Sequence, residues 1–199
     1  TSEMYGNQKK TLNEDSIFEP VSPYASAKLL AYWNTKIYRQ AYGIFASNGI
    51  MFNHESSQRG ENFISKKTTK AVAEISLGLR DILYVGNLNS YRDWGYAGDY
   101  VEAMWKIMQY KKPDDFVIAT NKTHSVRRFI EIAFKRVGIK IIWKGKGINE
   151  VGFEKKSKKI LVKVDKIYFR PNEVEYLKGN YSKINKLIGW KPKMTFEKL

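Results

Sequence analysis

Residues 22–28 read SPYASAK, and this stretch decides how the first part of the chain is organised. Ser22 followed by Pro23 is a helix-start signal, because a serine side chain caps the first turn and proline fits the first helical position. Apolar residues recur at helical spacing from Tyr24 onward, and Gly43 is placed to end the helix. The sequence therefore predicts a capped helix that runs from Tyr24 to the residue before Gly43.

Beyond this helix, the apolar pattern alternates between strand-like and helix-like segments. Expected strands cover residues 44–52, 82–85, 116–119, 139–143 and 160–164, and expected helices cover residues 62–77, 97–110, 125–137 and 182–188. Residues 144–159 are rich in glycine and lysine, which predicts a mobile loop or a hairpin. Alternating strands and helices are typical of an α/β fold with parallel strand pairing.

The composition narrows the class of protein. The chain has 199 residues, of which 43% are hydrophobic and 14% aromatic, and this excludes a disordered chain. It has no cysteine, which excludes a disulfide scaffold, a thiol nucleophile and a thiolate metal site. No membrane span and no leader segment are visible, so a soluble cytoplasmic protein is expected.

The charge is large and unevenly spread. The formal net charge is +15, and residues 101–199 hold 24 basic against 10 acidic side chains, compared with 11 and 10 in residues 1–100. A basic half favours an anionic partner such as nucleic acid, an anionic membrane or a phosphorylated small molecule. A solvated lysine surface explains the same count, so charge alone does not select a function.

Tyr24 and Lys28 form the strongest candidate for chemistry. Residues four apart share one face of a helix, so the phenol and the ammonium can meet the same ligand. A nearby ammonium favours the phenolate form of a tyrosine, which makes it a base near neutral pH. The same lysine can bind a cofactor ribose. Thr1 and Glu3 add a hydroxyl and a carboxylate, the latter 21 residues before Tyr24.

Several longer segments resemble the GDP-mannose 4,6-dehydratase family of extended short-chain dehydrogenases/reductases, which act on nucleotide sugars. The matching segments are TSEMYG, SPYASAK, NGIMFNHESSQRGENFISKK, GNLNSYRDWGYAGDYVEAMW, DFVIAT and YFRPNEVEYLKGN. The resemblance covers nearly the whole chain, from Thr1 to Pro192, and RDWGYAGDYVEAMW is its most specific part. Ser2 stands where related dTDP-glucose dehydratases usually carry an aspartate.

The resemblance implies a redox-neutral elimination with NADP as cofactor and a GDP-sugar as substrate. Tyr24 would take the proton of the sugar 4-hydroxyl while hydride moves from C4 to the cofactor. Glu3 would remove the C5 proton and help expel the 6-hydroxyl as water, after which the hydride returns to C6. Thr1 would bind the 4-oxygen, and Lys28 would hold the nicotinamide ribose and tune Tyr24.

The resemblance also implies binding residues outside this group. His54 and Arg59 would contact NADP, together with Tyr24 and Lys28. Physically, lysine and arginine suit a diphosphate, and a glutamate can accept hydrogen bonds from guanine. The residues expected to hold the GDP-sugar are Asn53, Lys67, Arg92, Arg170 and Glu173. No metal site is expected.

One family feature is missing. A glycine-rich turn after a first strand normally cradles the cofactor pyrophosphate. Gly145 and Gly147 imitate that turn, but Glu150 stands where the third glycine should be, so a loop is expected. The chain is therefore interpreted as a single truncated unit of a longer oligomeric protein, a dimer or tetramer, which alone would not bind NADP tightly. The expected parts are the distal part of a Rossmann-type parallel sheet (about 1–60 and 80–120) and a smaller C-terminal substrate-binding lobe (about 60–80 and 120–199).

Three alternative functions stay open at this point. A GDP-heptose would suit the same motifs, because they contact the nucleotide and the reacting C4–C6 edge of the sugar. A sugar-nucleotide epimerase or reductase belongs to the same superfamily. A basic nucleic-acid-binding module belongs to another class. Nucleic acid is not expected as a partner, because the aromatic residues do not interleave with the basic ones along the sequence and no nucleic-acid motif is visible. A membrane is not expected as a partner, because no membrane span is visible.

Overall fold

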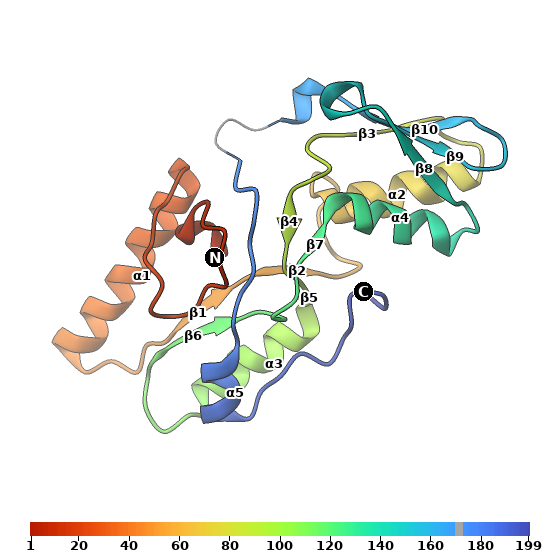
Figure 1. Ribbon diagram of the computed structural model, residues 1–199. Helices are drawn as coiled ribbons and strands as arrows, with labels where there is room; N and C mark the ends of the chain where they lie inside the picture. Colours follow the sequence, from red (N-terminus) through yellow and green to blue (C-terminus); the bar gives the residue numbers. More distant parts are fainter. Residues whose placement is uncertain (170–172) are drawn as a thin grey trace. The chain divides into compact units, whose positions relative to one another are not determined.

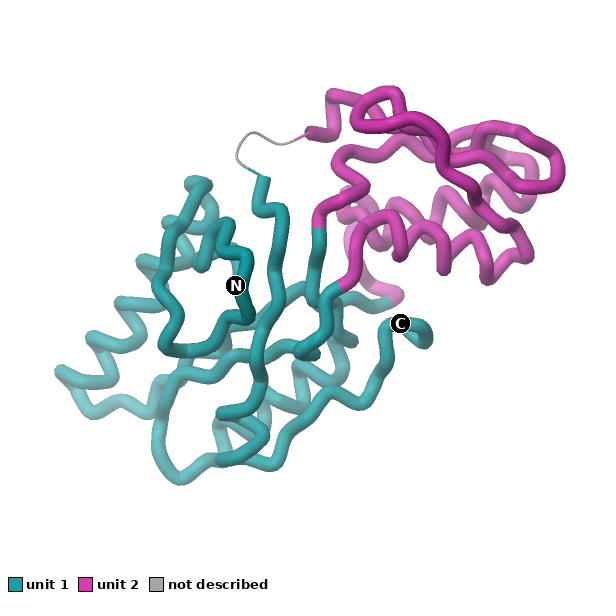
Figure 2. Tube along the Cα trace, viewed as in Figure 1, with its two compact units in different colours: residues 1–56, 91–123, 172–199 teal, residues 57–90, 124–171 magenta. Residues whose placement is uncertain are grey.

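The structure is a computed structural model that describes residues 1–169 and 173–199 (Figure 1). The chain forms two compact units, which are described separately (Figure 2). Unit 1 comprises residues 1–56, 91–123 and 172–199, and unit 2 comprises residues 57–90 and 124–171.

Unit 1 is built around α1 and a short parallel sheet. Its elements are the 3-10 turn η1 (Ser2–Tyr5), the helices α1 (Pro23–Tyr42), α3 (Ala97–Met108) and α5 (Ser182–Ile188), and the strands β1 (Asn48–Met51), β2 (Asn53–Glu55), β4 (Tyr91–Arg92), β5 (Trp94–Tyr96) and β6 (Asp115–Ile118). The Ser22 hydroxyl accepts a hydrogen bond from the backbone N–H of Ala25 at 3.1 Å, and Gly43 ends α1 in the left-handed conformation. Both ends of the predicted helix are therefore confirmed.

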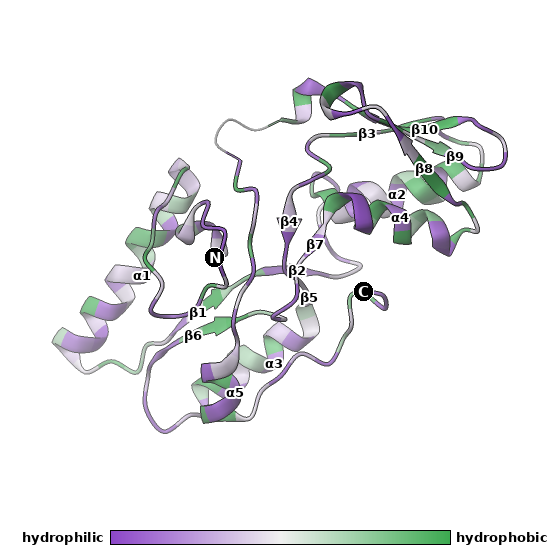
Figure 3. Ribbon diagram, viewed as in Figure 1, coloured by the Kyte–Doolittle hydropathy of each residue, from purple (hydrophilic) through white to green (hydrophobic). Residues whose placement is uncertain are grey.

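The sheet of unit 1 is parallel and is covered on both faces. β1 pairs with β6 and β2 pairs with β5, so residues 48–55 form one extended segment with two partners. Ile50 and Val117 pack in a core cluster with Tyr32 of α1, whereas Phe116 and Ile118 pack in a second cluster with residues of α3 and α5. Figure 3 shows that β1 and β6 are hydrophobic, as strands buried on both faces should be.

Unit 2 has two helices and a mixed four-stranded sheet. Its elements are the helices α2 (Ile64–Ser76) and α4 (Val126–Arg136), the strands β3 (Leu83–Val85), β7 (His124–Ser125), β8 (Ile141–Lys144), β9 (Val151–Glu154) and β10 (Ile160–Val164), and the 3-10 turns η2 (Gly147–Asn149) and η3 (Lys166–Tyr168). The strand order is β3-β10-β9-β8, in which β3 and β10 are parallel and the other two pairs are antiparallel. Parallel pairing therefore holds for only one pair of this sheet.

The α/β class is confirmed, and the structure corrects some of the expected boundaries. The strand expected over 44–52 begins only at Asn48, because Ile44 and Phe45 are exposed and the Ala46 N–H turns back to the carbonyl of Ile44. Of the two structures expected for residues 144–159, a loop or a hairpin, the hairpin is found, because β9 pairs antiparallel with β8. No α-helix follows Gly145 and Gly147, which confirms the expected loop.

The ranges of the two units also differ from the expected parts. Residues 172–199 belong to unit 1 rather than to the lobe, because Leu177, Ile184 and Trp190 are buried in the core clusters of unit 1. Residues 80–90 belong to unit 2, where Leu83 and Val85 of β3 are buried. The assignment of cofactor binding to one part and substrate binding to the other stays a prediction.

Candidate active site

Tyr24 and Lys28 lie on one face of α1, as their spacing predicted. The Lys28 ammonium is 5.7 Å from the centre of the Tyr24 ring. Both side chains are exposed, Tyr24 to 55%, so a ligand can reach them. The neighbouring Ala25 is fully buried and anchors this first turn of α1 in unit 1. The helix thus presents a phenol and an ammonium together, outward from a fixed backbone.

Thr1 and Glu3 lie on η1, which packs against α1. The Thr1 hydroxyl accepts a hydrogen bond from the Glu3 N–H at 3.4 Å, and it still has one hydrogen to donate. Met4 and Tyr5 are buried, so they hold the turn in the core while Thr1 and Glu3 stay partly exposed. The four expected catalytic residues therefore come from two elements of unit 1 that contact each other.

His54 and Asn53 lie on β2, one residue apart in a strand that also belongs to unit 1. The His54 Nδ1 is 2.9 Å from the carbonyl oxygen of Phe52; since that oxygen only accepts, the bond requires hydrogen on Nδ1. The imidazole also packs on the Tyr100 ring, with 5.1 Å between ring centres. The buried Oδ1 of Asn53 has no hydrogen-bond partner within the described part of the chain. An orphaned buried oxygen of this kind calls for a donor from a bound group.

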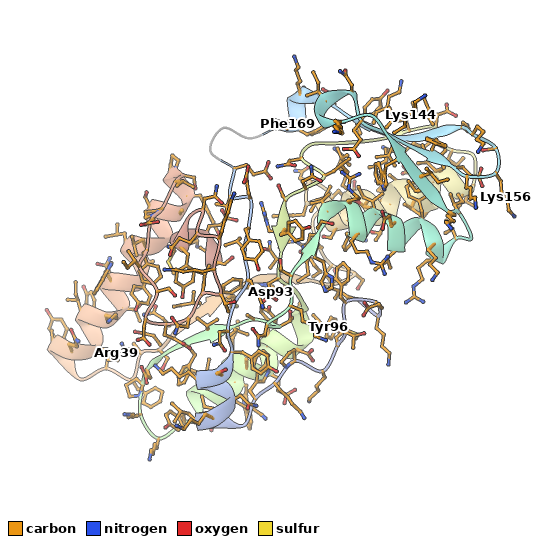
Figure 4. The ribbon with its side chains drawn as sticks, viewed as in Figure 1. Arg39, Asp93, Tyr96, Lys144, Lys156 and Phe169 are labelled. Carbon is orange, nitrogen blue, oxygen red and sulfur yellow. The ribbon has the colours of Figure 1, made fainter. Side chains whose placement is uncertain are left out.

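Asp93 is fully buried beside these strands, at the centre of Figure 4. Its carboxylate accepts hydrogen bonds from the Thr120 N–H and hydroxyl and from the N–H groups of Asn121 and Gly179. Burial raises the pKa of Asp93 to about 6, and the hydrogen bonds of Thr120, Gly179 and Asn121 oppose that rise. The carboxylate, which lies between β4 and β5, ties this point of the chain to the segment after β6 and to Gly179.

Arg92 and Glu173 are brought together in unit 1. Arg92 donates from Nη2 to Glu173 Oε1 at 3.4 Å and from Nη1 to its neighbour's carbonyl, Tyr91 O, at 2.9 Å. Both charged side chains are mostly buried, with exposures of 13% and 22%. Two residues expected to grip the same substrate, 81 positions apart, are thus neighbours in the fold.

Arg59 and Lys67 lie in unit 2, each against an aromatic ring. The guanidinium carbon of Arg59 is 3.5 Å from the centre of the Phe63 ring, and the Lys67 ammonium is 3.1 Å from the centre of the Tyr168 ring. Burial lowers the pKa of Lys67, Arg80 lowers it further, and Asp165 raises it. Arg170 lies outside the described residues. The remaining expected residues, Thr1, Glu3, Tyr24, Lys28, Asn53, His54, Arg92 and Glu173, all belong to unit 1.

The arrangement in unit 1 can perform acid–base chemistry on an exposed ligand. It offers a phenol, an ammonium, a carboxylate and a hydroxyl from two contacting elements, with an imidazole fixed in one tautomer on β2. No group of three or more metal-binding side chains occurs among residues 1–169 and 173–199. No helix in those same ranges is long and apolar enough to cross a membrane.

Comparison with known proteins gives the family. A family model described as GDP-mannose 4,6 dehydratase matches residues 1–199. The chain belongs to the GDP-mannose 4,6-dehydratase family. The family's enzymes from Drosophila melanogaster and Homo sapiens are 50% and 49% identical to it over 200 residues, and that of Sinorhizobium fredii is 51% identical over 192 residues. These matches cover 100%, 100% and 96% of the chain but 51%, 54% and 55% of the relatives, so the chain spans about half their length.

Solved structures agree on the fold of this GDP-mannose 4,6-dehydratase family member. RMD from Pseudomonas aeruginosa, complexed with NADPH, has a TM-score of 0.81 at 18% identity. The match covers 98% of this chain and 60% of the RMD chain. The dTDP-glucose 4,6-dehydratase of Bacillus anthracis, in complex with NAD, has a TM-score of 0.78 at 20% identity and covers 100% and 56%. The α/β fold with parallel strands is therefore that of Rossmann-type nucleotide-sugar enzymes.

Sequence reasoning missed the aromatic partners of the site. Tyr100 against His54 and Tyr168 against Lys67 carry no signal in spacing, because each pair is distant in sequence and meets only after folding. Phe63 is four residues from Arg59, but no helix was expected there to bring the two together. Asp93 lies inside the RDWG run, and nothing in the sequence assigns it a role. A single acidic residue between an arginine and a tryptophan is a weak hint of a buried carboxylate, and nothing in the sequence names Thr120 or Gly179 as its donors.

Proposed function

We propose that the complete protein is an NADP-dependent GDP-mannose 4,6-dehydratase, a lyase that converts GDP-mannose to its 4-keto-6-deoxy derivative. The observation that carries the proposal is the match of the whole chain to enzymes of that name at about half identity. The geometry of unit 1 supports it, because Tyr24 and Lys28 share a face of α1, and α1 contacts the turn η1, which holds Glu3 and is capped by Thr1.

Each catalytic side chain has a role that suits its place. Tyr24 takes the proton of the sugar 4-hydroxyl, and the Lys28 ammonium beside it stabilises the phenolate. The Thr1 hydroxyl donates to the 4-oxygen. Glu3 removes the C5 proton, made acidic by the 4-keto group, and returns a proton to the 6-hydroxyl as it leaves as water. One base on α1 and one on η1 thus serve the two proton transfers.

The residues present fit a nicotinamide cofactor. When bound, its nicotinamide ring supplies the acceptor and donor of hydride. The exposed Lys28 ammonium suits the hydroxyls of a ribose, and His54 offers Nε2 while Nδ1 is held by Phe52. Arg59 adds a cation that suits a phosphate group. RMD of Pseudomonas aeruginosa was solved with NADPH, which supports NADP over NAD.

The substrate residues suit a nucleoside diphosphate sugar. Lys67 and Arg92 are cations for the diphosphate, and the orphaned Oδ1 of Asn53 can accept from a sugar hydroxyl. Glu173 can accept from the N–H groups of guanine, with Arg92 holding its carboxylate in place. Arg170 joins this group as a proposal from the family match alone.

The protein is also proposed to be a homo-oligomer in the cytoplasm. Support for the oligomer comes from α1, which exposes a stripe of large apolar side chains at helical spacing. These are Leu30, Trp33, Ile37, Tyr38 and Tyr42, each at least 48% exposed. Contiguous apolar patches of this kind mark surfaces that another chain or segment covers.

Product analysis tests the proposed function. The complete protein, given GDP-mannose and catalytic NADP, should release the 4-keto-6-deoxy product with no net change in reduced cofactor. Glu3→Gln should stop water loss, because an amide cannot take the C5 proton, whereas Glu175→Gln, an exposed carboxylate, should leave the rate unchanged. An unimpaired Glu3→Gln enzyme would refute the role of Glu3. A product epimerised at C4 would refute the dehydratase.

A further inference from the structure

Unit 2 holds almost all of the excess positive charge. Its residues include 19 lysines and arginines against 7 acidic residues, a net charge of +12, whereas unit 1 holds 16 against 13. A nucleotide diphosphate needs only a few of those cations, and the proposed function uses three of them, Arg59, Lys67 and Arg170. The remaining charge of unit 2 is therefore unexplained by the active site.

One face of the sheet in unit 2 is covered by the two helices. Gly152 of β9 shares one face of the sheet with Trp143, Ile141 and Val162. A side chain at Gly152 would contact the side chains of these three residues. On that face the Trp143 Nε1–H donates to Glu131 of α4 at 3.0 Å. Figure 1 shows α2 and α4 together on one side of β3, β10, β9 and β8. Among the described residues of unit 2, no further α-helix is present to cover the opposite side.

Strand alternation assigns the residues of the opposite face. Tyr84, Lys163, Val151 and Lys144 stand in register across all four strands, one position away from the buried row. The next row of this outer face holds Phe153 and Ile142, which are also paired in register, whereas a β-bulge between Ile160 and Val162 interrupts the register of β10 there. Tyr84 is 40% exposed and Lys144 is exposed, so the face is accessible.

This outer face is basic and aromatic at once. Besides Lys144 and Lys163, Lys158 places its ammonium 5.9 Å from the centre of the Phe153 ring. None of the three lysines forms an ion pair within residues 1–169 and 173–199. Glu154, the one acidic residue in these four strands, alternates to the helix-covered side. Figure 4 shows Lys144 and Lys156 among the side chains that border the sheet.

We propose that the outer face of this sheet binds single-stranded nucleic acid. The Tyr84 and Phe153 rings, two strands apart, offer flat surfaces on which bases stack, and the lysines between and beside them neutralise the phosphates. Lys144, Phe153, Lys158 and Lys163 lie within twenty residues of the chain, whereas Tyr84 is 60 residues before Lys144. The strand register places Tyr84 beside Lys163, and this pairing of ring and lysine is absent from the linear pattern.

The positive charge of this face argues against a second copy of the chain as the occupant. A second copy of the chain would bring the same lysines face to face, and like charges opposed across an interface are repulsive. A double helix presents its bases edge-on inside grooves, which a sheet with exposed rings does not enter as a stacking surface. An unpaired strand offers both free base faces and a continuous row of phosphates.

Binding of labelled oligonucleotides to the complete protein tests the proposal. Fluorescence anisotropy with single-stranded probes of about 12 nucleotides should show binding that weakens with salt. Lys144→Gln with Lys163→Gln should weaken it and reduce the slope of log affinity against log salt by about 1.4. Tyr84→Ala should weaken it about fivefold or more, whereas Tyr84→Phe keeps the ring and the affinity.

A matched control separates the face from general charge. Lys111→Gln with Lys112→Gln removes two exposed lysines of unit 1 and should leave binding unchanged. Equal weakening by this pair would overturn the proposal, as would no binding at all. Duplex bound as tightly as single strand, or anionic phospholipid vesicles bound with no effect of Tyr84→Ala, would overturn it too. The dehydratase assay is independent of these outcomes.

Discussion

Asp93 shows what a single residue does for this fold. It is fully buried, yet its carboxylate accepts four hydrogen bonds from two other segments of unit 1, residues 120–121 and Gly179. Burial nevertheless raises its pKa from 3.8 to about 6, so desolvation outweighs those bonds for the ionised form. The residue immediately after Arg92 therefore fixes the backbone that carries a proposed substrate contact.

This pKa predicts how stability changes with pH. Between pH 3.8 and 6 the folded protein keeps a proton that the unfolded chain releases, so the free energy of unfolding falls as pH rises through this window. Over the whole titration, the free energy of unfolding falls by about 3 kcal/mol. Asp93→Asn cannot titrate, so the difference in free energy of unfolding between wild type and variant should shrink by about 2 kcal/mol from pH 4 to pH 6 in urea denaturation. A difference that grows with pH would contradict the assignment.

Tyr24 is the residue whose removal should affect the reaction most selectively. Tyr24→Phe keeps the ring and removes the acidic hydroxyl, so kcat of the complete protein should fall by about 10²–10⁴-fold. Tyr38→Phe is a matched control, because Tyr38 is 54% exposed on the same helix, and it should retain full activity. Circular dichroism should be unchanged for both. Equal activity of the two variants would remove Tyr24 from the mechanism.

The sequence predicts that two functional side chains lie together where they are only a few residues apart in the chain. Tyr24 and Lys28 share a helical face because of their four-residue separation, and the structure agrees. Arg92 and Glu173 are 81 positions apart, so only the family resemblance predicted that they bind the same substrate. The ring beneath Lys67 could not be foreseen, since Tyr168 reaches it through tertiary packing.

Among the elements, η1 depends on one glycine. Gly6 ends this turn with φ at 67°, and a Cβ there would lie 2.0 Å from the carbonyl oxygen of Glu19. Gly6→Ala should therefore destabilise unit 1 by about 2–4 kcal/mol, from backbone strain and from the displaced loop. The same change should reduce activity, because η1 positions Thr1 and Glu3.

Gly43 provides the control for that prediction. It ends α1 with φ at 63°, but a Cβ there would have no neighbour within 4 Å. Gly43→Ala should cost only the strain, about 1 kcal/mol, and leave activity intact. Equal losses of stability for the two variants in denaturant titrations would show that close approach to Glu19 is unimportant.

Elements with a clear local signal were predictable, and most of the shortest strands were not. The helix that begins at residue 23 has a serine cap, a proline and a terminal glycine, so its ends are encoded locally. The strands β4, β5 and β7 have only two or three residues, too few to show a period, and they were not expected. The β8–β9 hairpin lies partly in the lysine-rich segment 144–159, for which the composition left a loop and a hairpin open and could not choose between them.

For the whole molecule, the fold class followed from alternation but the division into units did not. Residues 172–199 return to unit 1 because Leu177, Ile184 and Trp190 complete its core, and such long-range packing has no local signal. The charge is different, because residues 101–199 already carry net +14 against +1 in residues 1–100, and folding places net +12 in unit 2 and +3 in unit 1. Folding therefore sorts the apolar residues in a way that linear order conceals, whereas the uneven charge is visible in the sequence.

The central claim is that the complete protein performs a dehydration with internal hydride transfer, and an isotope label tests it most directly. GDP-mannose carrying deuterium at C4 should be converted by the complete protein with NADP, and the product should be examined by NMR and mass spectrometry. The proposed function predicts deuterium at C6 of a 4-keto-6-deoxy product, with none accumulating in the cofactor pool. Absence of conversion, or deuterium found at C4 of an epimerised sugar, would contradict it.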